Sequence, residues 1–309
     1  MSAATNPHDD TAKQAWQSPE KAALYRRSRD PDHFGRYQLE EKIIGSWLDA
    51  LPANGLVLDI PCGAGRLLPT ILGREFRYIG ADFSAAMIDE ARKEAADPQV
   101  IGFLRADAER MPLLDNSVDC VIIWRLFHHL GESRVREAML REAARVSRDR
   151  VLISFHHALS FTAIRRSIQR TLFGRKHHGR PITHWRLSRE ASRSGLRLLE
   201  TKSFGKYRST NWFACFQKVS RCQQIQNNLD CGLGQMLCCP DTKQSLTLAD
   251  AILVERLNQQ IAAQKLQNRA GEFVKSKVEG GLVRADGKYA YPVLQGVPIL
   301  LVEEAIPLG

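Results

Sequence analysis

The sequence predicts an α/β protein: a seven-stranded, mostly parallel sheet with helices on both faces, followed by a small α+β C-terminal unit. Between residues 55 and 155, five short apolar runs alternate with segments of helical periodicity. Two more apolar runs follow, about six residues apart, which is typical of an antiparallel hairpin. Strands that alternate with helices form a parallel sheet covered on both faces. These observations together give seven strands.

The first predicted elements are helical. Residues 1–15 are expected to be disordered, and segments 21–30 and 33–51 carry apolar residues at helical spacing. The Pro-Ala-Asn-Gly sequence that follows ends the second helix. We therefore assign residues 1–35 to an N-terminal extension that is partly disordered or helical, and place the start of the main domain at residue 36.

The main domain is expected over residues 36–218. Its first five predicted strands are Leu56–Ile60, Tyr78–Ala81, Ile101–Leu104, Val118–Trp124 and Arg150–Phe155. The predicted helices between them are Arg66–Gly73, Ala85–Ala96 and Glu132–Val146. Ser84 is a favourable N-cap for the second of these helices, because its hydroxyl can accept a hydrogen bond from a free backbone N–H.

The segment 156–185 interrupts this alternation and is basic and amphipathic. Ser188 is expected to cap a short helix that ends at Ser194, and Leu196–Phe204 and Asn211–Phe216 are the two strands of the hairpin. Segment 165–208 holds thirteen Lys or Arg and two Glu, so its net charge (13 − 2 = +11) exceeds the +10 of the whole chain. Such density suits an anionic lipid surface, a phosphorylated molecule or RNA, with a solvated helix face as the alternative.

A polar linker at 219–235 leads into the C-terminal unit, 236–309. Its predicted elements are a helix over Asp250–Gln267 and the apolar strands Gly281–Val283, Tyr289–Val293 and Val297–Val302. This order of a helix followed by several strands gives a small α+β unit.

The composition is that of an ordinary globular protein, with 44% hydrophobic and 25% charged residues among 309. No run of 18 apolar residues occurs, and the N-terminus lacks the basic start and apolar centre of a secretory signal. The seven cysteines have irregular spacings, which argues against a disulfide framework. We expect a cytoplasmic protein, with peripheral attachment at the inner face of a membrane as an alternative.

The turn after the first strand carries the strongest motif, Val57-Leu-Asp-Ile-Pro-Cys-Gly-Ala-Gly-Arg66. Its glycines let a ligand approach the backbone, since no Cβ intervenes, and Asp59 stands where ligands bind in parallel sheets, beyond the carboxyl end of a strand. A dinucleotide site requires a third glycine at the position of Leu68, so that fingerprint is incomplete. A phosphate-binding P-loop is absent as well, because no Gly-Lys-Ser/Thr follows.

Acidic residues follow the next two strands. Asp82 ends the second strand, where its carboxylate can accept hydrogen bonds from the two hydroxyls of a ribose. Asp107 follows the third strand, in a position suited to the amino group of an adenine. The phrase Leu114-Asp-Asn-Ser-Val-Asp119 then leads into the fourth strand.

In order and placement, these motifs resemble those of class I S-adenosylmethionine-dependent methyltransferases, over residues 36–217. Within that family the chain looks most like the branch with the ubiquinone and menaquinone methyltransferases. The resemblance covers the glycine turn, the ribose acid Asp82, the pair Asp107-Ala108 and the phrases 114–119 and 126–130. It implies a Rossmann-like fold and S-adenosylmethionine as cofactor. One departure is Pro61, where family members often have glycine.

The predicted cofactor-binding residues follow from these motifs and from the end of the fourth strand. They are Asp59, Cys62, Gly63, Gly65, Asp82, Phe83, Asp107, Ala108, Trp124 and Arg125. Methyl transfer needs proximity and orientation, and a general base only if the acceptor must lose a proton. His128 is the first choice for a base, with His129, His156 and His157 at the same sheet edge; packing or surface roles are the alternative for each. No metal site is expected.

Segment 236–305 resembles a Trm112-like small domain that lacks the zinc cysteines. The matching phrases are Leu237-Cys-Cys-Pro240 and Tyr291-Pro-Val-Leu-Gln-Gly-Val-Pro-Ile-Leu-Leu301. Thr242 stands where a second zinc-binding cysteine would be needed. Trm112 proteins pair with methyltransferases and activate them, so the resemblance implies a helper domain packing in cis, with a simple stabilising appendage as the alternative.

Three hypotheses follow for the function. The first is a methyltransferase acting on a small-molecule or lipid-like acceptor, which the quinone branch favours. The second is an RNA or protein methyltransferase assisted by its own Trm112-like domain. The third is a non-catalytic scaffold that binds the cofactor. The motifs identify the methyl donor and leave the acceptor open.

Overall fold

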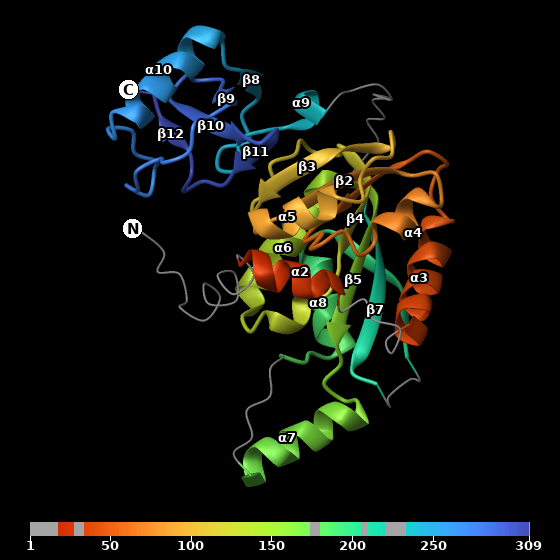
Figure 1. The fold of residues 1–309 in the computed structure, drawn as a ribbon. Helices are drawn as coiled ribbons and strands as arrows, with labels where there is room; N and C mark the ends of the chain where they lie inside the picture. Colours follow the sequence, from red (N-terminus) through yellow and green to blue (C-terminus); the bar gives the residue numbers. More distant parts are fainter. Residues whose placement is uncertain (1–17, 28–33, 174–179, 205–208, 220–232, 309) are drawn as a thin grey trace.

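The N-terminal two-thirds of the chain fold around seven strands (Figure 1). They are β1 (Leu56–Asp59), β2 (Arg77–Asp82), β3 (Val100–Ala106), β4 (Val118–Ile123), β5 (Ser147–His156), β6 (Leu196–Ser203) and β7 (Asn211–Lys218). Their order is β6-β7-β5-β4-β1-β2-β3. Strands β1 to β5 are parallel, whereas β7 runs antiparallel between β5 and β6. The predicted seven-stranded, mostly parallel sheet and its antiparallel hairpin are therefore confirmed.

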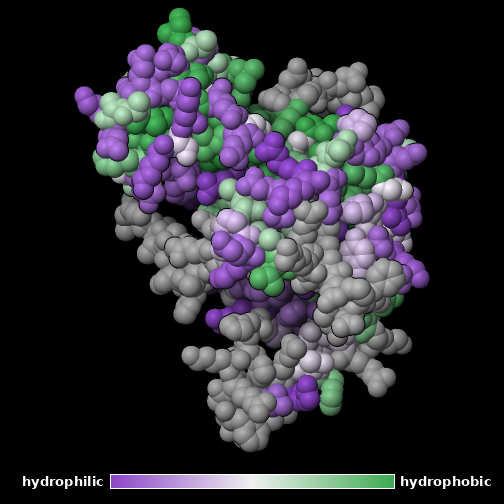
Figure 2. Space-filling view, in the orientation of Figure 1, coloured by the Kyte–Doolittle hydropathy of each residue, from purple (hydrophilic) through white to green (hydrophobic). Residues whose placement is uncertain are grey.

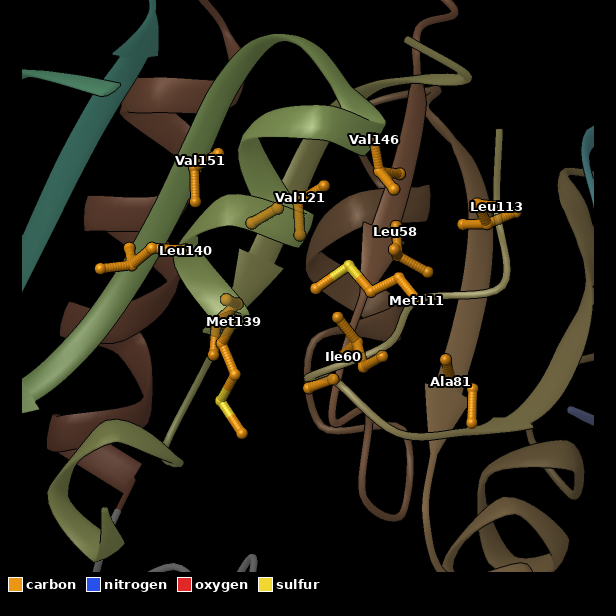
Figure 3. Packing of buried hydrophobic residues seen from close by; sticks show 14 of the residues in the cluster. Leu58, Ile60, Ala81, Met111, Leu113, Val121, Met139, Leu140, Val146 and Val151 are labelled. Atoms are coloured by element: carbon orange, nitrogen blue, oxygen red, sulfur yellow. The ribbon is translucent and has the colours of Figure 1, made fainter. Parts of the chain in front are cut away.

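The computed structural model describes residues 18–27, 34–173, 180–204, 209–219 and 233–308. Helices lie on both faces of the sheet. Val57 and other side chains of one face pack with α3 (Phe34–Leu48), α4 (Leu68–Leu72) and α5 (Ala85–Arg92). Leu58 and side chains of the opposite face pack with α6 (Ser133–Val146) and α8 (His184–Arg193). Figure 3 shows part of this second cluster, including Leu58, Val121 and Leu140.

The first helix, α2 (Pro19–Arg27), lies in the predicted N-terminal extension and packs on the domain. Its Ala22 is fully buried and forms a small cluster with Ala64 of the glycine turn and with Ala86 and Met87 of α5. Helix α3 begins at residue 34, so it spans the expected boundary at residue 36. The expected disordered segment 1–15 lies outside the described residues.

The helix ends agree only in part with the sequence prediction. The Ser84 hydroxyl accepts a hydrogen bond from the Met87 N–H, which confirms the cap, but α5 ends at Arg92 instead of Ala96. The prediction that Ser188 caps the helix before the hairpin was wrong. The cap is Thr183, whose hydroxyl accepts from the Arg186 N–H, and the helix begins at His184. An N-cap residue has an extended backbone, as Thr183 has, so that its own side-chain oxygen reaches a free N–H of the first turn, whereas Ser188 lies inside the helix.

Two further elements follow β4 and β5. A 3₁₀ turn, η2 (Phe127–His129), follows β4, and α7 (Phe161–Phe173) follows β5. Figure 1 shows α7 standing away from the sheet. Within the described residues, no helix is both long enough and apolar enough to cross a bilayer.

The C-terminal unit contains α9 (Leu233–Met236), β8 (Leu246–Leu248), α10 (Ala251–Ala262), β9 (Gly280–Arg284), β10 (Tyr289–Leu294), β11 (Val297–Leu300) and β12 (Ile306–Pro307). The predicted helix over Asp250–Gln267 is shorter than expected: Asp250 caps it, and it ends at Ala262. Strand β11 pairs in parallel with β3 and extends the sheet to twelve strands, so the edge of the main domain is covered by the C-terminal unit.

Candidate active site

A cavity of about 430 Å³ lies at the carboxyl ends of β1 to β4. This is where ligands bind in open α/β sheets, and the volume is within the range of small-molecule sites. Ten of the eleven residues predicted for the site line it, namely Asp59, Cys62, Gly63, Asp82, Phe83, Asp107, Ala108, Trp124, Arg125 and His128. The structure therefore brings together residues spread over 70 positions of the sequence (128 − 59 + 1 = 70).

The exception among the predicted residues is Gly65, which does not line the cavity. Its φ of 74° lies in the left-handed region, and a Cβ there would come within 3.3 Å of the Ala91 Cβ on α5. Gly65 therefore permits the turn and its packing on α5. Gly63 also has a left-handed φ, of 53°, and it does line the cavity. Its lack of a side chain leaves the backbone accessible to a ligand.

Asp82 links the segments that follow β1 and β2 by hydrogen bonds. Its Oδ2 accepts a hydrogen bond from the Gly63 N–H at 2.9 Å, and its Oδ1 accepts from the Ser84 N–H at 2.9 Å. Each carboxylate oxygen can accept a second hydrogen bond, so Asp82 can hold the turn and also bind a ligand. Burial raises the pKa of Asp82 to about 6, against the lowering effect of these backbone donors.

Asp59 is the most deeply buried acid of the cavity. Its Oδ2 accepts a hydrogen bond from the Tyr78 hydroxyl at 3.2 Å, while its Oδ1 is buried and has no hydrogen-bond partner. Burial raises the pKa of Asp59 to about 8, the Tyr78 hydroxyl lowers it, and the nearby Asp82 raises it further. A buried polar atom without a partner is costly, and a cationic group in the cavity would provide one.

Phe83, Asp107 and Ala108 form one wall of the cavity, and Arg105 contacts Phe83 in this wall. The Arg105 Nε–H donates to the Phe83 carbonyl oxygen at 3.0 Å, and its guanidinium lies 5.9 Å from the centre of the Phe83 ring. Asp107 Oδ1 accepts from the Glu109 N–H at 3.0 Å, which shapes the loop after β3. These contacts fix the backbone on which the cavity-lining side chains stand.

The end of β4 joins the cavity to α3. Trp124 stacks on Phe213 with ring centres 4.9 Å apart, and its Nε1–H donates to a carboxylate oxygen of Glu40 at 3.4 Å. Arg125 has a φ of 56°, which is strained for a residue other than glycine. Its N–H donates to the Ser154 hydroxyl at 2.6 Å. Backbone strain of this kind is concentrated at functional sites.

His128 lies in a cluster of three histidines. Its ring stacks on His156 with centres 4.1 Å apart and lies 4.1 Å from the ring of His129. Burial lowers the pKa of His128 to about 2, helped by the two neighbouring imidazoles and by Arg125. The ring is therefore neutral at physiological pH. It can accept a hydrogen bond, although its low pKa makes it a weaker base than the unperturbed histidine that the sequence suggested.

Several cavity-lining residues were not predicted from the sequence. Leu126, Leu130, Val135 and Met139 form an apolar wall beside the histidines, and Arg66 and Met87 line the side toward the glycine turn. Arg66 forms an ion pair with Glu40 at 3.0 Å. The position of Arg66 directly after the second glycine could have indicated its role. Leu126 and Leu130 flank the histidines in the phrase 126–130, whereas Val135 and Met139 carried no such signal, because they look like ordinary core residues of a helix.

The five cysteines in the described part of the chain are all buried, namely Cys62, Cys120, Cys215, Cys238 and Cys239. Cys62 lines the cavity, and burial raises the pKa of its thiol well above its usual value. In the C-terminal unit, Cys239 Sγ accepts from the Thr242 N–H at 3.4 Å and lies 3.1 Å from the Tyr291 hydroxyl. In the described part of the chain, no three His, Cys, Asp or Glu side chains converge in a way that could hold a metal ion.

Comparison with known proteins places this cavity in a methyltransferase domain. Residues 57–150 match the family described as "Methyltransferase domain". The chain is 33% identical over 105 residues to a 2-phytyl-1,4-naphtoquinone methyltransferase of Thermosynechococcus vestitus, a match covering 33% of this chain and 46% of that protein. The chain thus spans less than half the length of the curated relatives it matches. The match lies within the predicted methyltransferase domain, 36–218, and covers its residues 57–150.

Solved structures share the fold at low sequence identity. The magnesium protoporphyrin IX methyltransferase of Synechocystis, with bound SAH, superposes with a TM-score of 0.56 and 16% identity over 68% of this chain and 99% of that chain. A chain from a complex between the Haloferax volcanii Trm112 methyltransferase activator and a putative methyltransferase has a TM-score of 0.50 and 17% identity, over 64% of this chain and 96% of that chain. These likenesses confirm the predicted fold class.

Proposed function

We propose that this protein is an S-adenosylmethionine-dependent methyltransferase that acts on a small-molecule or lipid-like acceptor. The observation that carries the proposal is the buried Asp59 oxygen without a partner, which lies in a cavity beside the glycine turn. The matched methyltransferase domain at residues 57–150 supports it.

The residues of the cavity fit this cofactor. Asp59 would face a cationic group, because a cation gives its buried carboxylate the partner that it lacks. Gly63 leaves room for a close approach to the backbone. Asp82 and Asp107 would accept hydrogen bonds from the hydroxyl and amino groups of a nucleoside. When bound, S-adenosylmethionine supplies an activated methyl group on a positively charged sulfur.

The opposite wall is suited to an apolar acceptor. Leu126, Leu130, Val135 and Met139 offer apolar contacts, and His128 adds a neutral imidazole. An apolar pocket with few polar groups binds an aromatic or lipid-like molecule by excluding water. His128 would orient an acceptor hydroxyl by accepting its hydrogen bond and would take its proton if the reaction requires that. The naphthoquinone for which the Thermosynechococcus relative is named is of this chemical kind.

We further propose that the C-terminal unit is a Trm112-like helper domain acting in cis. Its chain runs against the loop that follows β3. The Cys238 N–H donates to the Pro112 carbonyl oxygen at 3.0 Å, and the Leu114 N–H donates to the Met236 carbonyl oxygen at 2.8 Å. The solved complex of a Trm112 activator with a methyltransferase is a precedent for such an arrangement.

A second link from the C-terminal unit leads directly to the cavity wall. Glu304 lies 3.6 Å from the guanidinium of Arg105, which in turn holds Phe83. Lys243 donates to Glu142 of α6 at 2.6 Å and forms a weaker bond to the Met111 carbonyl oxygen. These bonds would stabilise the loop that carries Asp107, so the domain would support cofactor binding without touching the cofactor.

The test is transfer of label from methyl-labelled S-adenosylmethionine to cell extract, followed by mass spectrometry of the small-molecule, lipid, RNA and protein fractions. We expect the label in the lipid or small-molecule fraction, and none with Asp82→Ala. Label in RNA or protein would instead support the alternative acceptor classes. Cofactor binding without label in any fraction would contradict a catalytic role and support the scaffold hypothesis.

A further inference from the structure

The segment between β5 and α8, residues 157–183, begins and ends beside the cavity, and we call it the excursion. The Ile182 N–H donates to the His156 carbonyl oxygen at 2.8 Å, and the Ala158 N–H donates to the Ile182 carbonyl oxygen at 3.0 Å. The Arg180 N–H donates to the carbonyl oxygen of His128, a cavity-lining residue, at 2.6 Å. The base of the excursion is therefore fixed to the apolar half of the cavity.

Exposed apolar side chains gather on this excursion and in the first turn of α8. They are Leu159 (44% exposed), Phe161 (70%), Ile164 (46%) and Trp185 (61%), which we call the docking patch. Four of the twelve large hydrophobic side chains exposed in the described part of the chain thus lie within residues 159–185. A local concentration of this kind marks an interaction surface. Figure 1 shows α7, which carries Phe161 and Ile164, well apart from the sheet.

A rigid histidine pair holds the two ends of the docking patch together. The His157 Nδ1 accepts from the Leu159 N–H at 3.2 Å, so its Nε2 carries the proton and donates to the His184 Nδ1 at 2.9 Å. Trp185 lies against His184 with ring centres 4.4 Å apart. Leu159 and Trp185 are therefore presented from one fixed base, although 25 residues separate them (185 − 159 − 1 = 25).

Positive charge surrounds the docking patch. Arg165 follows Ile164 on α7, Arg186 and Arg189 follow Trp185 on α8, and all three are exposed. Exposed apolar side chains beside arginines are the signature of a surface that lies in the headgroup region of an anionic bilayer. RNA-binding surfaces stack bases on aromatic rings; Phe161 and Trp185 are aromatic, whereas Leu159 and Ile164 are aliphatic and offer no stacking surface. The combination thus favours lipid.

We propose that the docking patch binds the surface of an anionic phospholipid bilayer. Leu159, Phe161, Ile164 and Trp185 insert among the headgroups, while the arginines pair with phosphates. A lipid-like acceptor then passes from the bilayer to the cavity along the base of the excursion, beside His128. This last step rests on the proposed methyltransferase function, whereas the binding to the bilayer does not.

The experiment is co-sedimentation of the full chain with two kinds of vesicle, one of phosphatidylcholine alone and one of equal parts phosphatidylcholine and phosphatidylglycerol. We expect binding to the anionic vesicles, weaker binding as salt increases, and little binding to the neutral ones. The double variant Phe161→Ser/Trp185→Ser should bind at least ~10-fold more weakly, because the inserted apolar area is lost.

The matched control is Leu248→Ser/Ile252→Ser, which removes two apolar side chains of 83% and 81% exposure in the C-terminal unit. It should bind like the wild type. Equal binding to both kinds of vesicle, equal loss in the two double variants, or binding to RNA without binding to vesicles would overturn the proposal. Cofactor binding, measured on the same samples without vesicles, checks folding and tests the proposed function separately.

Discussion

The two halves of the cavity are built in different ways. The half at β1 and β2 consists of residues next to strand ends, such as Asp59, Gly63 and Asp82, and it is rich in carboxylate and backbone groups. The half at η2 and α6 consists of apolar side chains and histidines, and its shape depends on contacts with α8 and the excursion that precedes it. The first half suits a polar, cationic cofactor and the second suits an apolar acceptor.

Burial shifts the pKa of a titratable side chain in opposite directions in the two halves. It raises the pKa of Asp59 to about 8 and lowers the pKa of His128 to about 2, so both side chains favour their neutral forms in the protein alone. A cationic ligand reverses this preference for Asp59, whereas a neutral acceptor leaves His128 neutral. The same desolvation thus keeps Asp59 neutral until a cation binds beside it, and it keeps the His128 ring uncharged beside a neutral acceptor.

The largest expected effect concerns the apolar half, at Arg136. Its guanidinium forms a buried, bidentate pair with Glu190 of α8, at 2.6 and 2.8 Å, and donates to the carbonyl oxygens of Leu130 and Gly131. Arg136→Met leaves the buried Glu190 carboxylate with Arg186, an exposed side chain at 3.2 Å, as its remaining ionic partner, so it should lower the free energy of unfolding by about 3–5 kcal/mol. Urea unfolding measures this.

A surface pair provides the control for Arg136. Arg193 and Glu137 join the same two helices, with Arg193 64% exposed and a distance of 3.3 Å. Arg193→Met should therefore cost less than about 1 kcal/mol. If the two variants lose the same free energy of unfolding, the loop at residues 130–131 is not held by the buried pair.

The second prediction tests whether His128 belongs to the acceptor half, by comparing the cofactor Kd with kcat. His128→Asn should leave the cofactor Kd within about twofold, because the ring lies at the acceptor side, and lower kcat by about 100-fold if the ring accepts a proton. The readout is calorimetry for the cofactor and label transfer for turnover. An unchanged kcat would mean that His128 only packs against His156, and a large change in Kd would mean that it belongs to the cofactor half.

The third prediction concerns pH. The folded pKa of Asp59 is raised from 3.8 to about 8, so the stability that its protonated form contributes is fully present below 3.8 and is lost as the pH rises through about 8. Affinity for a cationic cofactor should change in the opposite sense and rise by up to ~10-fold per pH unit between about 6 and 8. Calorimetry across this interval measures it. Asp59→Asn should flatten the dependence, and an equally steep curve in that variant would exclude Asp59 as its source.

The smallest effect is expected at the link to the C-terminal unit. Glu304→Ala removes the carboxylate beside Arg105 and should weaken cofactor binding by about threefold, since half-exposed ion pairs contribute less than about 1 kcal/mol. Glu303→Ala is the matched control, because Glu303 lies 3.9 Å from Arg110 and is 67% exposed. Equal Kd values for the two variants would argue against support of the cavity through Arg105.

The same contrast explains what the sequence could predict. Strand ends, glycines and acids are local features, so the pattern predicted the sheet and also placed Asp59 and Asp82 at strand ends, where they line the cavity. Gly65 is a predicted cofactor-binding residue that does not line the cavity, and a Cβ there would come within 3.3 Å of the Ala91 Cβ on α5. The apolar wall depends on how α6 and α8 meet the sheet. The parallel pairing of β11 with β3 was not foreseen, because strand pairing at a long sequence distance leaves no local signal.

The central claim is that the cavity between Asp59 and Asp82 binds S-adenosylmethionine, and calorimetric titration of the full chain tests it most directly. The wild type should bind one equivalent. Asp82→Ala should weaken binding at least ~100-fold, since it removes a ligand group and both backbone bonds that shape the turn. Asp89→Ala, an exposed acid on α5, should bind like the wild type. No measurable binding by the wild type, or the same Kd for all three proteins, would contradict the account.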